Sequence, residues 1–251
     1  MFRRDATAGG RLGLSQVPLI LMYHRVAEVA ENPLCVTPNR FAEQMTWLKR
    51  HGLRGVGVGT LVDAMRGGHQ RGLVGITFDD GFVNLVEAAL PELVRHGFTA
   101  TMFIVSGLLG QANEWDKGKV PVWPLMSAGQ VRELAAAGME IGSHGTMHRR
   151  LAGISPNQLE AEVRESRASL GELIGAPIRG FAYPHGSMDT AARHAVRDAG
   201  YDYACAVMTP MTELGFMALP RMFIAECDSD IRMAAKRLLF RPYMAANGRR
   251  R

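Results

Sequence analysis

The chain has 251 residues and a formal net charge of +5, and 47% of its residues are hydrophobic. This composition excludes a disordered chain, and the length suits one large α/β domain as well as two small ones. Much of the excess positive charge lies at the two ends, in residues 3–4 and 249–251. It does not form a basic stripe interleaved with aromatic residues, so we expect no nucleic-acid partner. The basic termini are compatible with weak contact to an anionic membrane surface.

The three cysteines, Cys35, Cys205 and Cys227, are far apart in the sequence, which argues against a disulfide framework or a cysteine-based zinc site. No apolar run reaches the length of a membrane span. The first apolar run, residues 17–22, is too short for the hydrophobic part of a signal peptide. We therefore expect a soluble, cytoplasmic protein without an integral membrane segment, whose oligomeric state the sequence does not specify.

Short apolar runs alternate with amphipathic stretches along the whole chain. The apolar runs predict strands over residues 17–23, 73–78, 100–105, 139–142, 180–183, 202–207 and 219–224. The amphipathic stretches predict helices over residues 38–52, 82–96, 128–138, 155–174, 189–200 and 228–240. Residues 106–125 contain Trp115 and Trp123 and are predicted to form one long loop, a feature that is usually functional.

This alternation continues without a break in composition and therefore predicts parallel strands in a single α/β domain. The length fits a distorted (β/α) barrel of about seven or eight strands, with a doubly wound open sheet as the alternative. We expect residues 17–240 to form the catalytic domain, residues 1–16 a flexible segment and residues 241–251 a basic tail. In either architecture the site lies at the carboxyl ends of the strands. Polar residues follow the predicted strands there: His24, Asp79, Asp80, His144 and His185.

Two adjacent carboxylates, Asp79 and Asp80, follow the predicted strand that ends at Phe78. Two crowded carboxylates resist joint ionisation unless a cation holds one of them. One of the pair can therefore bind a metal while the other acts as a general base. The alternative is an Asp-Asp-Gly turn whose aspartate caps the following helix.

Two histidines, His144 and His148, lie four residues apart. This spacing places both imidazoles on one side of a helix or of a tight loop. Two histidines and one carboxylate form a metal site that keeps positions open for water and substrate. The alternative is a pair of surface histidines beside Arg149 and Arg150.

Three segments, residues 77–80 (TFDD), 141–148 (IGSHGTMH) and 181–186 (FAYPHG), occur in a characteristic order and spacing. They resemble the first motif, the His-Ser/Thr-x-x-His motif and the Phe-Arg-Pro-Pro-Tyr-Gly motif of the polysaccharide deacetylases. This is carbohydrate esterase family four, with its nodulation-type chitooligosaccharide deacetylase homology domain, and the resemblance covers about residues 17–225. Residues 21–26 (LMYHRV) resemble a subgroup related to deacetylases of biofilm and other exopolysaccharides.

The resemblance implies a metal-dependent hydrolase that removes N-acetyl groups from an amino-sugar-containing oligosaccharide, polysaccharide or glycoconjugate. Asp80, His144 and His148 would bind a divalent metal, usually zinc, with cobalt, nickel or iron as alternatives. Asp79 would be the base that deprotonates the attacking water. The backbone N–H of His185 would help to stabilise the oxyanion.

The chain departs from the family pattern in three places. Gly145 stands in the Ser/Thr position of the histidine motif, and Ala182 stands where the family has the arginine that orients the catalytic aspartate. Arg179 is near enough in the sequence to substitute for that arginine. Residues 219–221 (LPR) resemble the start of the late Leu-x-x-x-x-x-His motif, the source of the general acid, but no histidine follows His194.

The missing late histidine leaves the proton donor for the leaving amine to be found elsewhere. His24 is the first candidate because it follows the first predicted strand on the expected site face, and His185 is the second. We place Tyr183, Trp115 and Arg179 at the substrate. The two aromatic rings could stack on sugar rings, and core packing is the alternative.

Two other functions are compatible with these residues. The first is a metal-dependent hydrolase of another linear or cyclic amide. The second is a carbohydrate-binding pseudoenzyme, suggested by the missing late histidine and the missing motif arginine. The complete set of Asp79, Asp80, His144 and His148 argues against a degenerate site. The sequence does not identify the sugar or its chain length.

Overall fold

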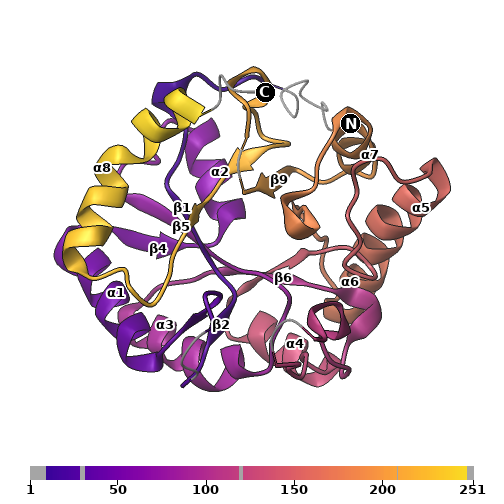
Figure 1. Ribbon diagram of the computed structural model, residues 1–251, viewed down its shortest axis with the longest axis horizontal. Helices are drawn as coiled ribbons and strands as arrows, with labels where there is room; N and C mark the ends of the chain where they lie inside the picture. The colour runs from indigo at the N-terminus through magenta and orange to yellow at the C-terminus, as the bar shows by residue number, and fades with distance from the viewer. Residues whose placement is uncertain (1–9, 29–31, 119–120, 208, 248–251) are drawn as a thin grey trace.

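Parallel strands form the centre of the molecule, and helices surround them in a ring (Figure 1). The computed structural model describes residues 10–28, 32–118, 121–207 and 209–247. Within this part of the chain, nine strands form one sheet in the order β10-β9-β8-β7-β6-β5-β1-β11, with β4 paired to β5. All the neighbouring strands are parallel. The predicted single-domain α/β barrel is therefore confirmed.

The bounds of the elements are as follows. The strands of the barrel are β1 (Ile20–Tyr23), β4 (Arg54–Val56), β5 (Leu73–Phe78), β6 (Thr101–Ile104), β7 (Glu140–Ser143), β8 (Gly180–Ala182), β9 (Tyr203–Ala206), β10 (Leu219–Pro220) and β11 (Met222–Phe223). A small second sheet pairs β2 (Arg25–Val26) with β3 (Cys35–Val36). The helices are α1 (Pro38–Arg50), α2 (Val58–Arg66), α3 (Leu90–His96), α4 (Ala128–Ala136), α5 (Pro156–Glu160), α6 (Ser166–Ile174), α7 (Thr190–Asp198) and α8 (Asp230–Asn247).

Shorter helical turns complete the described structure. Two are π-helical: η2 (Leu85–Ala89) leads into α3, and η5 (Ala161–Glu165) joins α5 to α6. The 3₁₀ turns are η1 (Leu14–Gln16), η3 (Ser106–Leu108), η4 (Glu114–Asp116), η6 (Pro184–Gly186) and η7 (Met211–Glu213). None of the described helices combines the length and the apolar composition that crossing a bilayer requires.

Glycines in the strands make room for large side chains inside the barrel. A Cβ atom on Gly142 would overlap the ring of Phe103, and one on Gly180 would overlap the ring of Tyr203. Both rings are fully buried. The absence of a side chain at these two positions therefore lets the aromatic residues fill the interior, as close packing of a protein core requires.

The barrel has a seam between β10 and β11, which are the two ends of the strand order. The two strands follow each other directly in the sequence: β10 pairs with β9 on one side of the seam, and β11 pairs with β1 on the other. Arg221, the residue between them, therefore lies at the seam, and its side chain is buried.

Most of the predicted elements agree with the structure. The predicted strand over residues 219–224 is instead two strands, β10 and β11, separated by Arg221, and the sequence prediction also left out the short strands β2 and β3. The sequence prediction left out β4 and α2, because β4 has only three residues and is followed by a glycine-rich stretch. The last helix, α8, extends through residue 240 to Asn247. Most of the predicted basic tail is thus helical, whereas residues 248–251 and the first part of the predicted flexible segment, residues 1–9, lie outside the described structure.

Candidate active site

The candidate site lies at the carboxyl ends of the parallel strands, as the strand rule predicts. A cavity of about 260 Å³ opens there. Its lining brings together residues from distant parts of the chain: His24, Asp79, Asp80, His144, His148 and His185. The sequence-predicted catalytic and metal residues thus share one cavity.

Asp80, His144 and His148 form a compact cluster. Asp80 Oδ1 lies 3.4 Å from His144 Nε2 and 3.2 Å from His148 Nε2. One donor atom from each of the three residues lies within 4.8 Å of the others, and all three side chains are buried. Buried ionisable groups so close together are commonly paired or hold a metal.

The hydrogen bond of His144 supports a metal at this cluster. Its Nδ1–H donates to the carbonyl oxygen of Ala182 at 2.8 Å, an arrangement that typically fixes a metal-binding imidazole. With Nδ1 protonated, Nε2 of His144 faces the carboxylate of Asp80. Two facing lone pairs need a proton or a cation between them, so the donor set fits a divalent metal.

The backbone around the cluster is strained. Among the described residues, those other than glycine with positive φ are Asp80 (73°), His148 (58°) and His185 (57°). Such conformations cost roughly 1–3 kcal/mol each and persist where the surrounding structure enforces them. All three lie at this cavity, which indicates that the fold holds these side chains in place for function.

Charges in the cavity control the protonation of the cluster. Burial alone would raise the pKa of Asp80, but hydrogen bonds from His144 and His148 hold this pKa well below its usual range. Burial opposes protonation of His144, but the carboxylates of Asp79 and Asp80 raise its pKa above the ordinary value. The carboxylate of Asp80 is therefore ionised and attracts positive charge to the cluster.

Asp79 is held by an arginine from the other end of the chain. Arg221 donates from Nη1 to Asp79 Oδ1 at 2.6 Å and from Nη2 to Oδ2 at 2.8 Å. Arg221 also donates to Thr77 Oγ1 and to the carbonyl oxygen of Ala206. Burial would raise the pKa of Asp79, but Arg221 lowers it overall. Arg221 therefore both orients Asp79 and keeps it ionised, as a general base requires.

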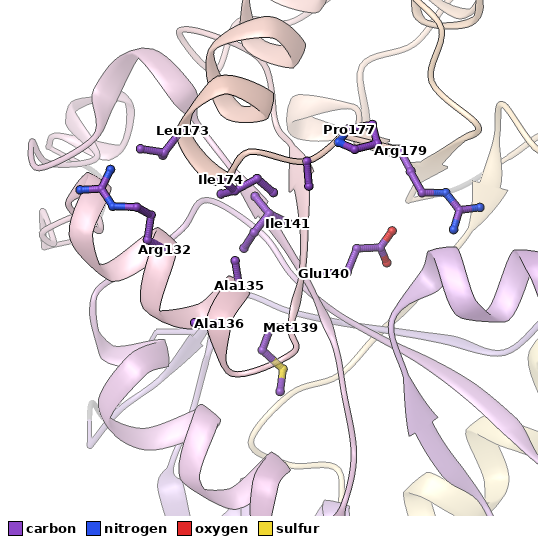
Figure 2. Close-up of a pocket in the computed structure, with 11 residues that line it drawn as sticks. Arg132, Ala135, Ala136, Met139, Glu140, Ile141, Leu173, Ile174, Pro177 and Arg179 are labelled. Atoms are coloured by element: carbon purple, nitrogen blue, oxygen red, sulfur yellow. The ribbon is translucent and has the colours of Figure 1, made fainter.

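The structure corrects the prediction for Arg179. This residue precedes β8 and lies at the opposite end of the strand from the cavity, where it pairs with Asp63 and Asp202. Arg179 and Glu140 line a separate hollow of about 510 Å³ beside α4 and α6 (Figure 2). Arg179 does not contact Asp79, and the orienting role that the sequence assigned to it belongs to Arg221.

Glu162 organises the loop between His144 and His148, and no pattern in the sequence indicated this role. The carboxylate Oε2 of Glu162 accepts hydrogen bonds from the backbone N–H groups of Thr146 and Met147, both at 2.9 Å. A Cβ atom on Gly145 (φ 81°) would approach the same oxygen to 2.7 Å. The glycine that departs from the family motif therefore makes room for a carboxylate that anchors the loop.

The two candidate proton donors occupy different positions. His24 is partly buried and lines the cavity, and the ring of Phe223 lies 6.4 Å from its ring. Burial lowers the pKa of His24. His185 is more exposed, and its ring lies 4.4 Å from that of His148. Burial and the neighbouring His148 lower the pKa of His185 to about 4.

Trp115 lies at the cavity, as predicted. Its ring is 4.1 Å from that of His148, and the side chain is partly exposed. The next residue, Asp116, pairs with the fully buried Arg25 at 3.2 Å. The guanidinium of Arg25 lies over the ring of Phe82, 4.2 Å from its centre. These contacts fix the loop that carries Trp115 to the body of the barrel.

Tyr183 lines the cavity, but the structure corrects its predicted role in stacking on a sugar ring. Its side chain is fully buried, packs against Phe181 and donates its hydroxyl hydrogen to the carbonyl oxygen of Met217 at 2.9 Å. No ring face is exposed for stacking on a sugar. Tyr183 therefore packs in the core, which was the alternative.

Comparisons with known proteins show which proteins the chain resembles in sequence. A Bacillus subtilis protein, YxkH, whose name places it among the polysaccharide deacetylases, is 27% identical over 184 residues, or 72% of this chain and 61% of that protein. The chain thus spans less than two thirds of that relative. The poly-beta-1,6-N-acetyl-D-glucosamine N-deacetylase of Staphylococcus aureus is 24% identical over 76% of this chain and 68% of that protein.

A solved structure shows the same fold. The Streptococcus pyogenes deacetylase PplD, in complex with acetate, superposes with a TM-score of 0.76 at 21% identity, over 87% of this chain and 97% of that one. Residues 66–204, more than half of the chain, match the family described as polysaccharide deacetylase. The chain therefore belongs to the polysaccharide deacetylase family.

Proposed function

We propose that this protein is a metal-dependent N-deacetylase that hydrolyses the acetamide of an N-acetylated amino sugar. The observation that carries the proposal is the position of Asp79. Its carboxylate is fixed and kept ionised by Arg221 in the same cavity as the cluster of Asp80, His144 and His148. A base beside a metal-binding cluster is the arrangement that amide hydrolysis needs.

The donor set suggests zinc. Two imidazoles and one carboxylate are typical ligands of a catalytic zinc ion with open positions. When bound, such an ion would polarise the acetamide carbonyl and make water more acidic. His144 and His148 would hold it through Nε2, and Asp80 through Oδ1.

Asp79 would accept the proton of the attacking water. Each carboxylate oxygen of Asp79 has two lone pairs, and the contact with Arg221 uses one of them. The second lone pair leaves Asp79 able to accept a proton. His24, on the wall of the same cavity, would give a proton to the leaving amine. Trp115, beside His148, would contact the sugar ring.

The choice of substrate class rests on the relatives. The Staphylococcus aureus relative is named for a polymer of N-acetylglucosamine. A cavity of about 260 Å³ next to the cluster is large enough for an acetamide and part of its sugar ring. We therefore propose N-acetylglucosamine units, in an oligosaccharide or a glycoconjugate, as the substrate.

The test measures metal content and acetate release on the same samples. The substrates are oligomers of N-acetylglucosamine with β-1,4 and β-1,6 linkages. We expect about one metal per chain in the wild type, and loss of both metal and acetate release in His148→Ala. His194→Ala, an exposed histidine on α7, is the matched control and should retain both. A wild type that binds no metal after reloading with zinc would rule the proposal out.

A further inference from the structure

A further hollow lies along the seam of the barrel, between α8 and β11. We call it the seam groove; its volume is about 530 Å³. Most of its wall is apolar, formed by side chains that include Met222, Leu239, Phe240 and Tyr243. The mechanism proposed above gives this groove no role.

The seam groove adjoins the active-site cavity. Val207 and Phe223 line both hollows. The ring of Phe223 lies 6.4 Å from that of His24, which lines the cavity itself. A molecule whose sugar occupies the cavity could therefore extend past Phe223 into the groove.

The outer wall of the groove exposes apolar side chains to solvent. Leu239 is 55% exposed and Tyr243 is 54% exposed. An apolar partner that covers these side chains would remove them from water and so gain free energy. Their position beside the active-site cavity suggests that this partner is part of the substrate.

The end of the groove nearest the active site carries positive charge. Figure 1 shows α8 on the outside of the barrel, and α8 begins seven residues after β11 ends at the active-site face. Arg241, near the other end of α8, donates to the carbonyl oxygen of Val17, which precedes β1, so α8 runs away from the active-site face. Arg232, in the first turn of α8, therefore lies nearer the site than Leu239. Its guanidinium contacts Cys227 Sγ, and it has no carboxylate partner in the described part of the chain. Lys236, by contrast, pairs with Asp228.

We propose that the seam groove binds the apolar chain of an amphiphilic substrate, in which a phosphate joins the N-acetylated sugar to that chain. The order of the three groups along such a substrate matches the order of the cavity, Arg232 and Leu239 on the protein. The sugar lies in the cavity, the phosphate near Arg232 and the chain along Leu239. The reaction in this inference rests on the proposed function, whereas the ligand is inferred from the groove.

The experiment compares two substrates of the full-length, metal-loaded protein. One is N-acetylglucosamine 1-phosphate esterified to a ten-carbon alkyl chain, used below its micelle concentration, and the other is a chitooligosaccharide. We expect a wild-type kcat/KM at least tenfold higher for the amphiphile. Leu239→Asp should remove this preference without changing turnover of the chitooligosaccharide, and Arg232→Gln should reduce it several-fold.

Ile231→Asp is the matched control, because Ile231 is 82% exposed on the same helix but does not line the groove. It should keep the preference for the amphiphile. A wild type without the preference would overturn the proposal, and so would equal losses in Leu239→Asp and Ile231→Asp.

Binding of decyl phosphate, followed by calorimetry, separates this proposal from the proposed reaction. We expect wild-type and Ile231→Asp proteins to bind it with similar affinity, and Leu239→Asp to bind at least tenfold more weakly. This result would support the groove even if neither substrate released acetate. Absence of binding in the wild type would overturn the groove, whatever the activity.

Discussion

Arg221, at the seam of the barrel, holds Asp79 with two parallel hydrogen bonds of 2.6 and 2.8 Å. The two residues are 142 positions apart in the sequence, and both are buried. The segment that joins the two edges of the sheet therefore also supplies the partner of the proposed catalytic base.

Replacing Arg221 tests this partnership. Arg221→Lys keeps the positive charge but loses the planar, two-point contact. We expect kcat to fall by about ten- to a hundredfold, since the base loses its orientation. Metal content should remain that of the wild type, because Arg221 does not contact the cluster of Asp80, His144 and His148. Loss of metal together with activity would mean that Arg221 acts on the whole site.

Arg179 offers the contrasting case, an arginine whose removal should affect stability and not catalysis. Because its ion pairs are partly exposed, Arg179→Gln should lower the free energy of unfolding by no more than about 1 kcal/mol at pH 7 and leave kcat unchanged. A fall in kcat with a normal denaturation curve would restore the role that the structure denies it.

The ion pair between Arg179 and Asp63 should make the stability of the protein depend on pH. The hydrogen bonds from Arg179 lower the pKa of Asp63. A carboxyl group with a lowered pKa in the folded state stabilises the fold above its ordinary pKa, and this contribution is lost as the pH falls through the lowered value. The difference in unfolding free energy between wild type and Arg179→Gln should therefore shrink below about pH 4. Urea denaturation at pH 7 and at pH 3 measures it, and a constant difference would contradict the assignment.

Glu162 tests how the loop between the two metal-site histidines is held. Removing a group that positions a metal ligand typically weakens metal binding ten- to a hundredfold. We expect this range for Glu162→Ala, because the N–H groups of Thr146 and Met147 lose their common acceptor. Titration of the metal-free protein with zinc measures the affinity. Glu160→Ala, an exposed residue on α5, is the control and should bind zinc as the wild type does.

Replacing His24 tests whether it is the proton donor. We expect His24→Ala to retain its metal and to lose about a hundredfold in turnover, the usual contribution of a general acid. His185→Ala is the comparison, because His185 is the second candidate. Near-normal turnover in His24→Ala with metal bound would remove His24 from the mechanism, and a larger loss in His185→Ala would move the role there.

Most of the fold and the centre of the site could be predicted because their signals are local. Alternating apolar runs predict parallel strands, and the polar residues at the ends of these runs meet at one face of the barrel. Asp79, Asp80, His144 and His148 came together for this reason.

The remaining assignments depend on contacts that no local pattern encodes. Arg221 and Glu162 reach the site from distant segments. The sequence pointed to Arg221 only through the resemblance of residues 219–221 to the start of the late motif. The error at Arg179 was avoidable, because a residue that precedes a parallel strand lies at the end away from the site. Tyr183 follows its strand as predicted, but its ring packs against Phe181 instead of the substrate.

The position of Arg221 also has a consequence during biosynthesis. A nascent chain contains Asp79, Asp80, His144 and His148 well before the ribosome has added residue 221. A chain released before that point would carry every proposed metal ligand but no partner for the buried carboxylate of Asp79. The competence of the base thus depends on synthesis of the C-terminal segment that joins the two edges of the barrel.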